Sequence, residues 1–190
     1  RLFLYQDTDM LQKAANENWV NIQGLYFMPG MKFPPDGLEQ VWAKKMAESI
    51  TGDFIIIDAG SNLLNPFQKE LLLRSDFIVV VVTPLIFTYH RLWEQWLHEF
   101  FIPHHLVRKT GVLINQYEGP VSPKDIATLM GVTLLGDLPH EKYLLERINL
   151  GEITGLFSGK YQKKISKAWE VVKKYAETAS TIVPSSLDRK

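Results

Sequence analysis

The chain of 190 residues contains no cysteine. Disulfides, thiolate metal sites, iron–sulfur clusters and cysteine nucleophiles are therefore excluded, and a reducing cytoplasm suits such a chain. No apolar run approaches the roughly 18 residues that a membrane-spanning helix needs. Lysine and arginine number 21, as do aspartate and glutamate, so the net charge is zero. Because nucleic-acid-binding domains are usually clearly basic, this balance argues against nucleic-acid binding through this chain alone.

Two sequence signatures of catalysis are also missing. The phosphate-binding pattern G-x-x-x-x-G-K-[ST] occurs nowhere, because Gly159 and Lys160 have no earlier glycine at the right spacing and no Ser or Thr after them. The G-x-S-x-G elbow is absent as well, which argues against a serine hydrolase of that type. The first residue is Arg1 rather than methionine, and we interpret the chain as a piece of a longer protein.

The sequence alternates between strand-like and helix-like segments. Segments 54–57 (FIII) and 77–82 (FIVVVV) are apolar at every position, which is typical of parallel strands buried on both faces. The pattern predicts an α/β fold, a doubly wound, mostly parallel sheet with helices on both faces. One such domain is expected over 1–179, with a flexible tail at 180–190. Strands are expected at 2–5, 24–30, 54–57, 76–84, 110–115 and 133–139, and helices at 9–17, 36–50, 65–75, 88–101, 122–130, 140–150 and 159–178.

Polar residues follow the expected strands at their carboxyl ends, where ligands bind in sheets of this kind. A carboxylate such as Asp58 in that position commonly holds Mg²⁺, directly or through water, beside the phosphates of a nucleotide. Ala59 and Gly60 would let the next loop approach closely or move. The alternative is that Asp58 only caps a turn or the next helix. The whole set is Asp7, Asp9, Asp58, Thr83, Asn115, Asp137 and Pro139.

Four stretches resemble, in order, motifs of the MinD/ParA-type P-loop ATPases of the SIMIBI class. They are LFLYQDTDM at 2–10, the segment 52–84 that begins GDFIIIDAGSN, TGVLINQY at 110–117 and GVTLLGDLPHEKYLLERINLGE at 131–152. The resemblance implies a P-loop NTPase-like fold. The family's first strand and phosphate loop are absent from the chain, and we expect them upstream of Arg1. The alternative is that the sheet has been rearranged. The family's usual D-x-D-P is DTDM in this chain, and its usual switch II motif T-P-P-G or L-P-A-G is AGSN. Such changes suit the divergent CpaE/TadZ-like pilus-assembly branch, in which the ATP loop itself can be altered.

The resemblance implies roles for particular residues. Asp58 would match the Walker B acid and hold Mg²⁺, most simply through water. Gly60 would begin the switch II loop that senses the γ-phosphate. Asp9, or else Asp7, would lie near the attacking water. The implied cofactors are ATP and Mg²⁺, and the implied activity, if the chain is an enzyme, is ATP hydrolysis.

The same resemblance implies a base site and a set of partners. Asn115 would hydrogen-bond the adenine, and the backbone around Pro139 would border the base. The family dimerises around ATP and positions septa, plasmids, flagella and pili, so we expect a homodimer that switches its contacts with a protein partner or cargo. It would lie in the cytoplasm or at the inner face of the cell membrane. The alternative is a non-catalytic scaffold that keeps the fold and works by protein contacts.

The last expected helix is basic and amphipathic. From residue 160 onward there are eight basic and three acidic residues, and such a helix can lie on an anionic membrane or on a partner. The other interpretation is that its apolar stripe packs on the sheet while the lysines face water. The stripe consists of Tyr161, Ile165, Trp169, Val172 and Ala176.

Two further groups of residues invite a functional interpretation. His90, His98, His104 and His105 lack the carboxylate spacing of a metal site, so we expect them to be structural or exposed. The aromatic stretch 91–101 (RLWEQWLHEFF) is expected to pack mostly on the sheet, with any excess forming a dimer or partner face.

Overall fold

In the computed structural model the chain divides into two compact units, 1–75 and 76–190. Only part of the residues in each unit is described. Each unit is described here by itself. Asp7 and Asp9, the expected strand 2–5 and the expected helix 9–17 lie outside the described residues, as does most of the expected helix 140–150. The described residues are 20–22, 25–27, 37, 39–50, 52, 54–60, 65–85, 93–141, 143, 146 and 159–182.

The first unit contains a short antiparallel strand pair. Strand β1 (Val20–Ile22) pairs with β2 (Leu25–Phe27), with Ile22 opposite Leu25. The sequence predicts a strand around β2, but β1 was not expected. A segment of three residues shows too little periodicity to be recognised without its partner.

Two helices of the first unit pack against each other. They are α2 (Glu39–Ser49) and α3 (Pro66–Arg74), which match the expected helices at 36–50 and 65–75. At the start of α3, the Asn65 side chain accepts a hydrogen bond from the N–H of Phe67 at 2.8 Å, and Pro66 takes the first helical position, where proline is favoured. At its other end, Arg74 forms ion pairs with Glu70 and Glu48.

The prediction of a buried strand at 54–57 is wrong in this structure. These residues belong to neither a helix nor a strand. All four side chains are exposed, with Phe54 at 54% and Ile56 at 81%. An all-apolar strand is buried only when strands pair on its edges and helices cover its faces, and among the described residues no strand pairs with this segment. The segment therefore presents apolar surface.

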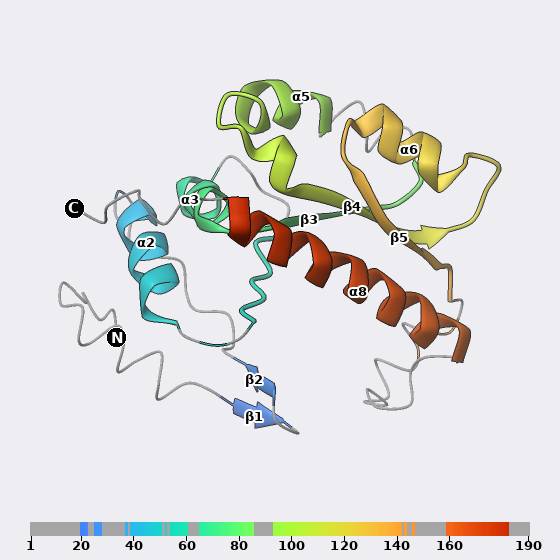
Figure 1. Cartoon of the computed structure of the whole chain (residues 1–190), viewed down its shortest axis with the longest axis horizontal. Helices are drawn as coiled ribbons and strands as arrows, with labels where there is room; N and C mark the ends of the chain where they lie inside the picture. Colours follow the sequence, from blue (N-terminus) through green and yellow to red (C-terminus); the bar gives the residue numbers. More distant parts are fainter. Residues whose placement is uncertain are drawn as a thin grey trace. The chain divides into compact units, whose positions relative to one another are not determined.

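The second unit is built on a parallel sheet. Its strands are β3 (Ile78–Val82), β4 (Thr110–Tyr117) and β5 (Thr133–Pro139), in the order β3-β4-β5 and all parallel. Helix α8 (Gly159–Ile182) lies on one face of the sheet, and α5 (Glu94–Trp96) and α6 (Pro123–Met130) lie on the other (Figure 1). The expected strands at 76–84, 110–115 and 133–139 are confirmed.

The core of the second unit lies on both faces of β4 and β5. Val112 and Ile114 are fully buried, as is Leu135 on β5. A Cβ at Gly136 would lie 3.2 Å from the Cβ of Ala168, so glycine there allows α8 to pack close to β5. Helix α8 contacts chiefly β5.

The expectation that FIVVVV is buried on both faces is wrong for two of its residues. Val79 is 40% and Val81 57% exposed, whereas Ile78 and Val82 are buried. Strand β3 is at the end of the described sheet and α8 covers mainly β5, so the face of β3 that carries Val79 and Val81 is only partly covered. Near it, Phe77 stacks on Tyr175 of α8, with ring centroids 6.0 Å apart.

The chain between β3 and β4 differs from the regular helix expected at 88–101. Its described part runs from α5 into a π-helix, η2 (Leu97–Phe101), and then into a 3₁₀ helix, η3 (Leu106–Lys109). Trp93 and Phe101 are buried with ring centroids 5.0 Å apart. Phe100 of this π turn is buried as well.

Helix α8 is longer than expected. It continues to Ile182 and so includes residues 180–182 of the expected tail, while 183–190 lie outside the described residues. Its Tyr161 and Ala168 are buried against the rest of the unit, so this part of the apolar side is used in packing. None of the helices in the described residues is both long enough and apolar enough to span a bilayer.

Candidate functional site

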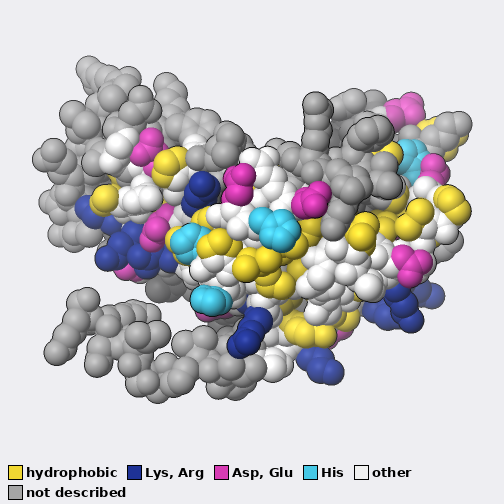
Figure 2. Space-filling model, turned by 90° about the horizontal axis from the view of Figure 1, so that it is seen from above, with side chains coloured by type: hydrophobic (Ala, Val, Ile, Leu, Met, Phe, Trp, Pro, Cys, Tyr) yellow, Lys and Arg dark blue, Asp and Glu magenta, His cyan; other side chains and the backbone are white. Residues whose placement is uncertain are grey.

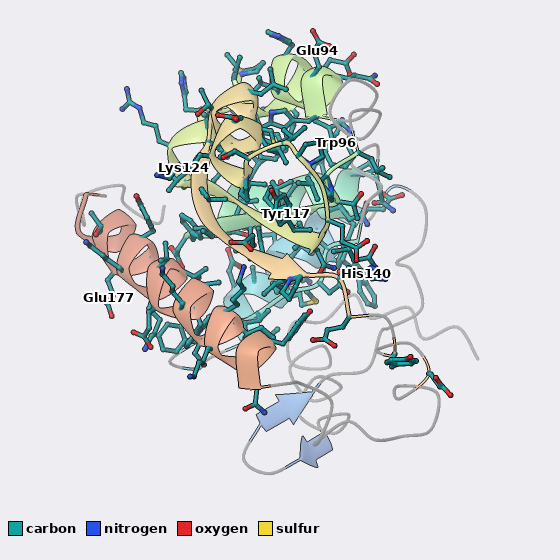
Figure 3. The ribbon with its side chains drawn as sticks, turned by 90° about the vertical axis from the view of Figure 1, so that its right-hand side faces the viewer. Glu94, Trp96, Tyr117, Lys124, His140 and Glu177 are labelled. Atoms are coloured by element: carbon teal, nitrogen blue, oxygen red, sulfur yellow. The ribbon has the colours of Figure 1, made fainter. Side chains whose placement is uncertain are left out.

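The carboxyl ends of β4 and β5 meet at one edge of the parallel sheet. The register pairs Ile114 with Asp137 and Tyr117 with Pro139, which brings Asn115 and Pro139 to neighbouring positions at this edge. Thr83 follows the end of β3 on the same side, since Val82 pairs with Ile114. Tyr117 and His140, labelled in Figure 3, belong to the same two strand ends. We call the residues at the ends of β4 and β5 the β4–β5 rim: Asn115, Tyr117, Asp137, Pro139 and His140.

Asn115 has a restrained side chain at this rim. Its Oδ1 accepts a hydrogen bond from the N–H of Gln116 at 2.9 Å. Gln116 has a φ of 54°, a left-handed conformation that residues other than glycine adopt at a cost. The register between β4 and β5 shifts at this point, as at a bulge, and bulges redirect side chains at the ends of strands.

Asp137 of the rim forms an ion pair with a residue of α8. Its carboxylate is bonded to the Nζ of Lys164 on α8, and both side chains are partly buried. This contact ties α8 to the end of β5. It also occupies a carboxylate that the sequence placed among the candidate ligands.

Asp58 and Gly60 lie in the first unit, directly after the exposed apolar segment. Asp58 is exposed, and its Oδ1 accepts a hydrogen bond from the N–H of Gly60 at 2.9 Å. Gly60 has a φ of 66°, which favours glycine. The local turn that the alternative interpretation of Asp58 requires is therefore formed, and the carboxylate remains at the surface.

Gln68 is a residue that the sequence analysis did not single out. Its side-chain Nε2 donates a hydrogen bond to the carbonyl of Ala59, and so joins α3 to the loop that carries Asp58. A signal was present, because Asn65-Pro66-Phe67-Gln68 has the spacing of a capping box, in which a residue of this type reaches back over the helix start.

Comparison with known proteins supports the fold. No family model matches the sequence, and no curated protein matches it. Among solved structures, the chain is similar to the MinD cell division protein of Aquifex aeolicus, with a TM-score of 0.58 and 15% sequence identity over 96% of this chain and 77% of that one.

This chain shares the α/β fold of MinD. The prediction of a doubly wound, mostly parallel α/β fold is confirmed by this likeness and by the parallel sheet. At 15% identity the likeness to MinD concerns the fold alone.

The residues at Asp58 suit one kind of metal site and not another. Among the described residues, no group of three or more His, Asp or Glu side chains is arranged to hold a metal ion. Mg²⁺ usually keeps several waters and is bound by one or two carboxylates together with the phosphates of its substrate. A single exposed carboxylate therefore fits an ion that arrives with a nucleotide, and does not fit a metal held by protein ligands alone.

The remaining candidates lie at the surface of the second unit. His98, His104 and His105 are exposed, whereas His90 lies outside the described residues. Histidine side chains are visible at the surface drawn in Figure 2. On α8, Lys163, Lys167 and Lys174 are exposed.

Proposed function

We propose that the protein is a nucleotide-dependent positioning or partitioning switch of the MinD/ParA kind. It would bind ATP with Mg²⁺, dimerise, and change its contacts with a protein partner or cargo as the nucleotide is hydrolysed. The observation that carries this proposal is the parallel sheet of the MinD fold with Asn115 and Pro139 brought together at its carboxyl edge, because ligands bind at that edge in open α/β sheets.

In this proposal each candidate residue has a separate task. Asp58 would hold Mg²⁺ through water, and Gly60 would let the following loop respond to the γ-phosphate. Asp9, outside the described residues, would orient the attacking water. Asn115 would bind the adenine, and the backbone at Pro139 would border it.

The partners and the location belong to the same proposal. We propose a cytoplasmic homodimer, with pilus assembly as its setting and division or DNA partition as the other settings. Contact with the inner face of the membrane would involve the exposed Lys163, Lys167 and Lys174, because Tyr161 and Ala168 of α8 are buried in packing. Such contact would be electrostatic and would weaken with salt.

Calorimetry on the full-length protein with ATP and MgCl₂ tests this function. We expect a saturable heat with ATP and Mg²⁺ that disappears when EDTA is added. Asp58→Ala should abolish turnover and leave the circular dichroism spectrum unchanged. The control is Glu177→Gln, since Glu177 is exposed on α8 and points away from the sheet (Figure 3). Unchanged turnover in Asp58→Ala would contradict the role given to Asp58.

A non-catalytic scaffold is the second candidate. The observation that favours it is the exposed apolar surface of Phe54, Ile55, Ile56 and Ile57, because contiguous exposed apolar residues commonly mark protein contacts. The ion pair between Asp137 and Lys164 also favours the scaffold, because it occupies one of the carboxylates that were candidate ligands. A full-length protein that binds a partner but produces no heat with ATP and Mg²⁺ would establish the scaffold and overturn the switch.

A further inference from the structure

One peptide group in the Asp58 loop is held at both of its ends. The carbonyl of Ala59 accepts a hydrogen bond from Nε2 of Gln68. The N–H of Gly60, which belongs to the same peptide group, donates to Oδ1 of Asp58 at 2.9 Å. Because the peptide group is planar, a contact that fixes its carbonyl also fixes the direction of its N–H.

The orientation of the Gln68 amide is set by this contact. Since the Ala59 carbonyl can only accept a hydrogen bond, the amide must turn its NH₂ group toward it. Gln68 Oε1 is then directed elsewhere, and it is buried with no hydrogen-bond partner among the described residues. An unsatisfied buried acceptor costs about 1–3 kcal/mol. The amide therefore bonds to Ala59 through its NH₂ group although its oxygen stays unsatisfied.

Gly60 is fitted to the same arrangement. A Cβ at this position would lie 3.2 Å from Nε2 of Gln68, which is tight, and the φ of 66° disfavours side chains. The contact also departs from a capping box, in which a glutamine at this position would accept a hydrogen bond from the N–H of the capping residue, here Asn65. The Gln68 side chain therefore holds the Asp58 loop and does not cap α3.

We propose that Gln68 is a positioning residue for the carboxylate of Asp58. It holds the Ala59–Gly60 peptide group, and the N–H of Gly60 in turn orients the carboxylate. The choice of ligand, a hydrated divalent cation that accompanies a nucleotide, rests on the proposed function. The hold on the loop rests only on contacts within the first unit.

Amide hydrogen exchange at Gly60, followed by NMR in the full-length protein, tests the hold on the loop. Gln68→Met keeps the length of the side chain and removes its donor, and we expect exchange at Gly60 to become about tenfold faster, as the loss of one hydrogen bond implies. Gln68→Lys keeps a donor and should restore slow exchange. Gln40→Met on α2 is the control, because Gln40 is exposed and should leave Gly60 unchanged. Unchanged exchange in a folded Gln68→Met protein would overturn the inference.

The dependence of ATP binding on Mg²⁺ tests the consequence for the carboxylate. In Gln68→Met we expect the Mg²⁺ concentration at half-saturation to rise about three- to tenfold, the effect of one weakened hydrogen bond, with normal binding at excess Mg²⁺. If the unaltered protein binds ATP but Gln68→Met needs no more Mg²⁺, the positioning role is wrong and the proposed function stands. If the unaltered protein binds no ATP while exchange at Gly60 responds to Gln68→Met, the hold on the loop stands and the proposed function fails. Gly60→Ala disturbs the same peptide group from the other side, and it replaces Gln68→Met as the test variant if that protein does not fold.

Discussion

The indole N–H of Trp93 donates a hydrogen bond to the carbonyl of Met130 at 2.9 Å, and both residues are buried. Met130 is the last residue of α6. The carbonyl groups at the end of a helix have no partner within it, and here a side chain from before α5 supplies one. This contact joins two of the segments that cover one face of the sheet.

Replacing Trp93 should therefore weaken the second unit. In Trp93→Phe the Met130 carbonyl loses its donor while it stays buried, and we expect a loss of about 1–3 kcal/mol in the free energy of unfolding. Urea denaturation followed by circular dichroism measures it. Trp96→Phe removes an indole that is only partly buried, and it should cost less. Equal losses in the two variants would show that the hydrogen bond contributes nothing beyond side-chain size.

The close contact between Gly111 and Leu135 predicts a steric effect. A Cβ at Gly111 would lie 2.6 Å from Cδ2 of Leu135, a buried side chain, so Gly111→Ala forces a shift that costs about 1–3 kcal/mol. Gly159→Ala, at the start of α8 with open space around it, should be neutral or slightly stabilising. In a double-mutant cycle, Leu135→Val should recover part of the loss, and strict additivity would contradict the contact.

Tyr161 predicts a loss of stability at alkaline pH. Burial, with a smaller contribution from the charge of Glu141, raises the pKa of its phenol above the ordinary value of 10.0. In the unfolded chain the phenol ionises first, so stability falls as pH rises from 10 through the raised pKa. Tyr161→Phe should lose less stability than the unaltered protein over this range in urea titrations. Tyr175→Phe, at a half-exposed position, should lose as much as the unaltered protein.

Lys109 predicts the opposite slope. Burial lowers the pKa of its ammonium group from 10.5, against a smaller attraction to Asp76 that raises it. The folded state therefore releases this proton before the unfolded state does, and stability rises as pH increases from the lowered pKa toward 10.5. Lys109→Met should be more stable than the unaltered protein at pH 7, with an advantage that shrinks toward pH 10.5. An advantage that does not change with pH would be due to packing alone.

Asn115 predicts the base preference of the proposed nucleotide site. If its amide binds the adenine, Asn115→Ala should weaken ATP binding about tenfold, as the loss of one or two hydrogen bonds implies, and GTP binding much less. Fluorescence competition with labelled ATP measures both constants. The control is Gln116→Ala at the next residue, which keeps the amide of Asn115. Equal weakening for ATP and GTP would remove Asn115 from base recognition.

The sequence predicted most elements of the second unit because its local signals agree there. Strands β4 and β5 follow the expected ranges. Helix α6 is capped at its start by Ser122, whose Oγ accepts a hydrogen bond from the N–H of Lys124 at 3.2 Å, and at its end by the left-handed Gly131. Capping residues, apolar periodicity and turn residues all act over a few positions, so a single sequence carries them.

What the sequence did not predict depends on contacts between distant residues. The run FIII predicts a buried strand by its composition, yet burial requires neighbours that composition does not supply. The pairing of Asp137 with Lys164 joins residues 27 positions apart, and that of Gln68 with Ala59 depends on where α3 lies relative to a loop. Asn115 and Pro139 were placed at a common edge because parallel strands require it, and the register of β4 and β5 has them there.

The left-handed backbone of Gln116 has a consequence for thermal tolerance. Glycine at that position would recover about 1–3 kcal/mol of conformational strain, enough to raise the melting temperature by several degrees in a domain of this size. The same change would give the end of β4 additional conformations and leave the amide of Asn115 without one fixed direction. The chain gives up heat resistance at residue 116 and keeps a defined geometry at residue 115.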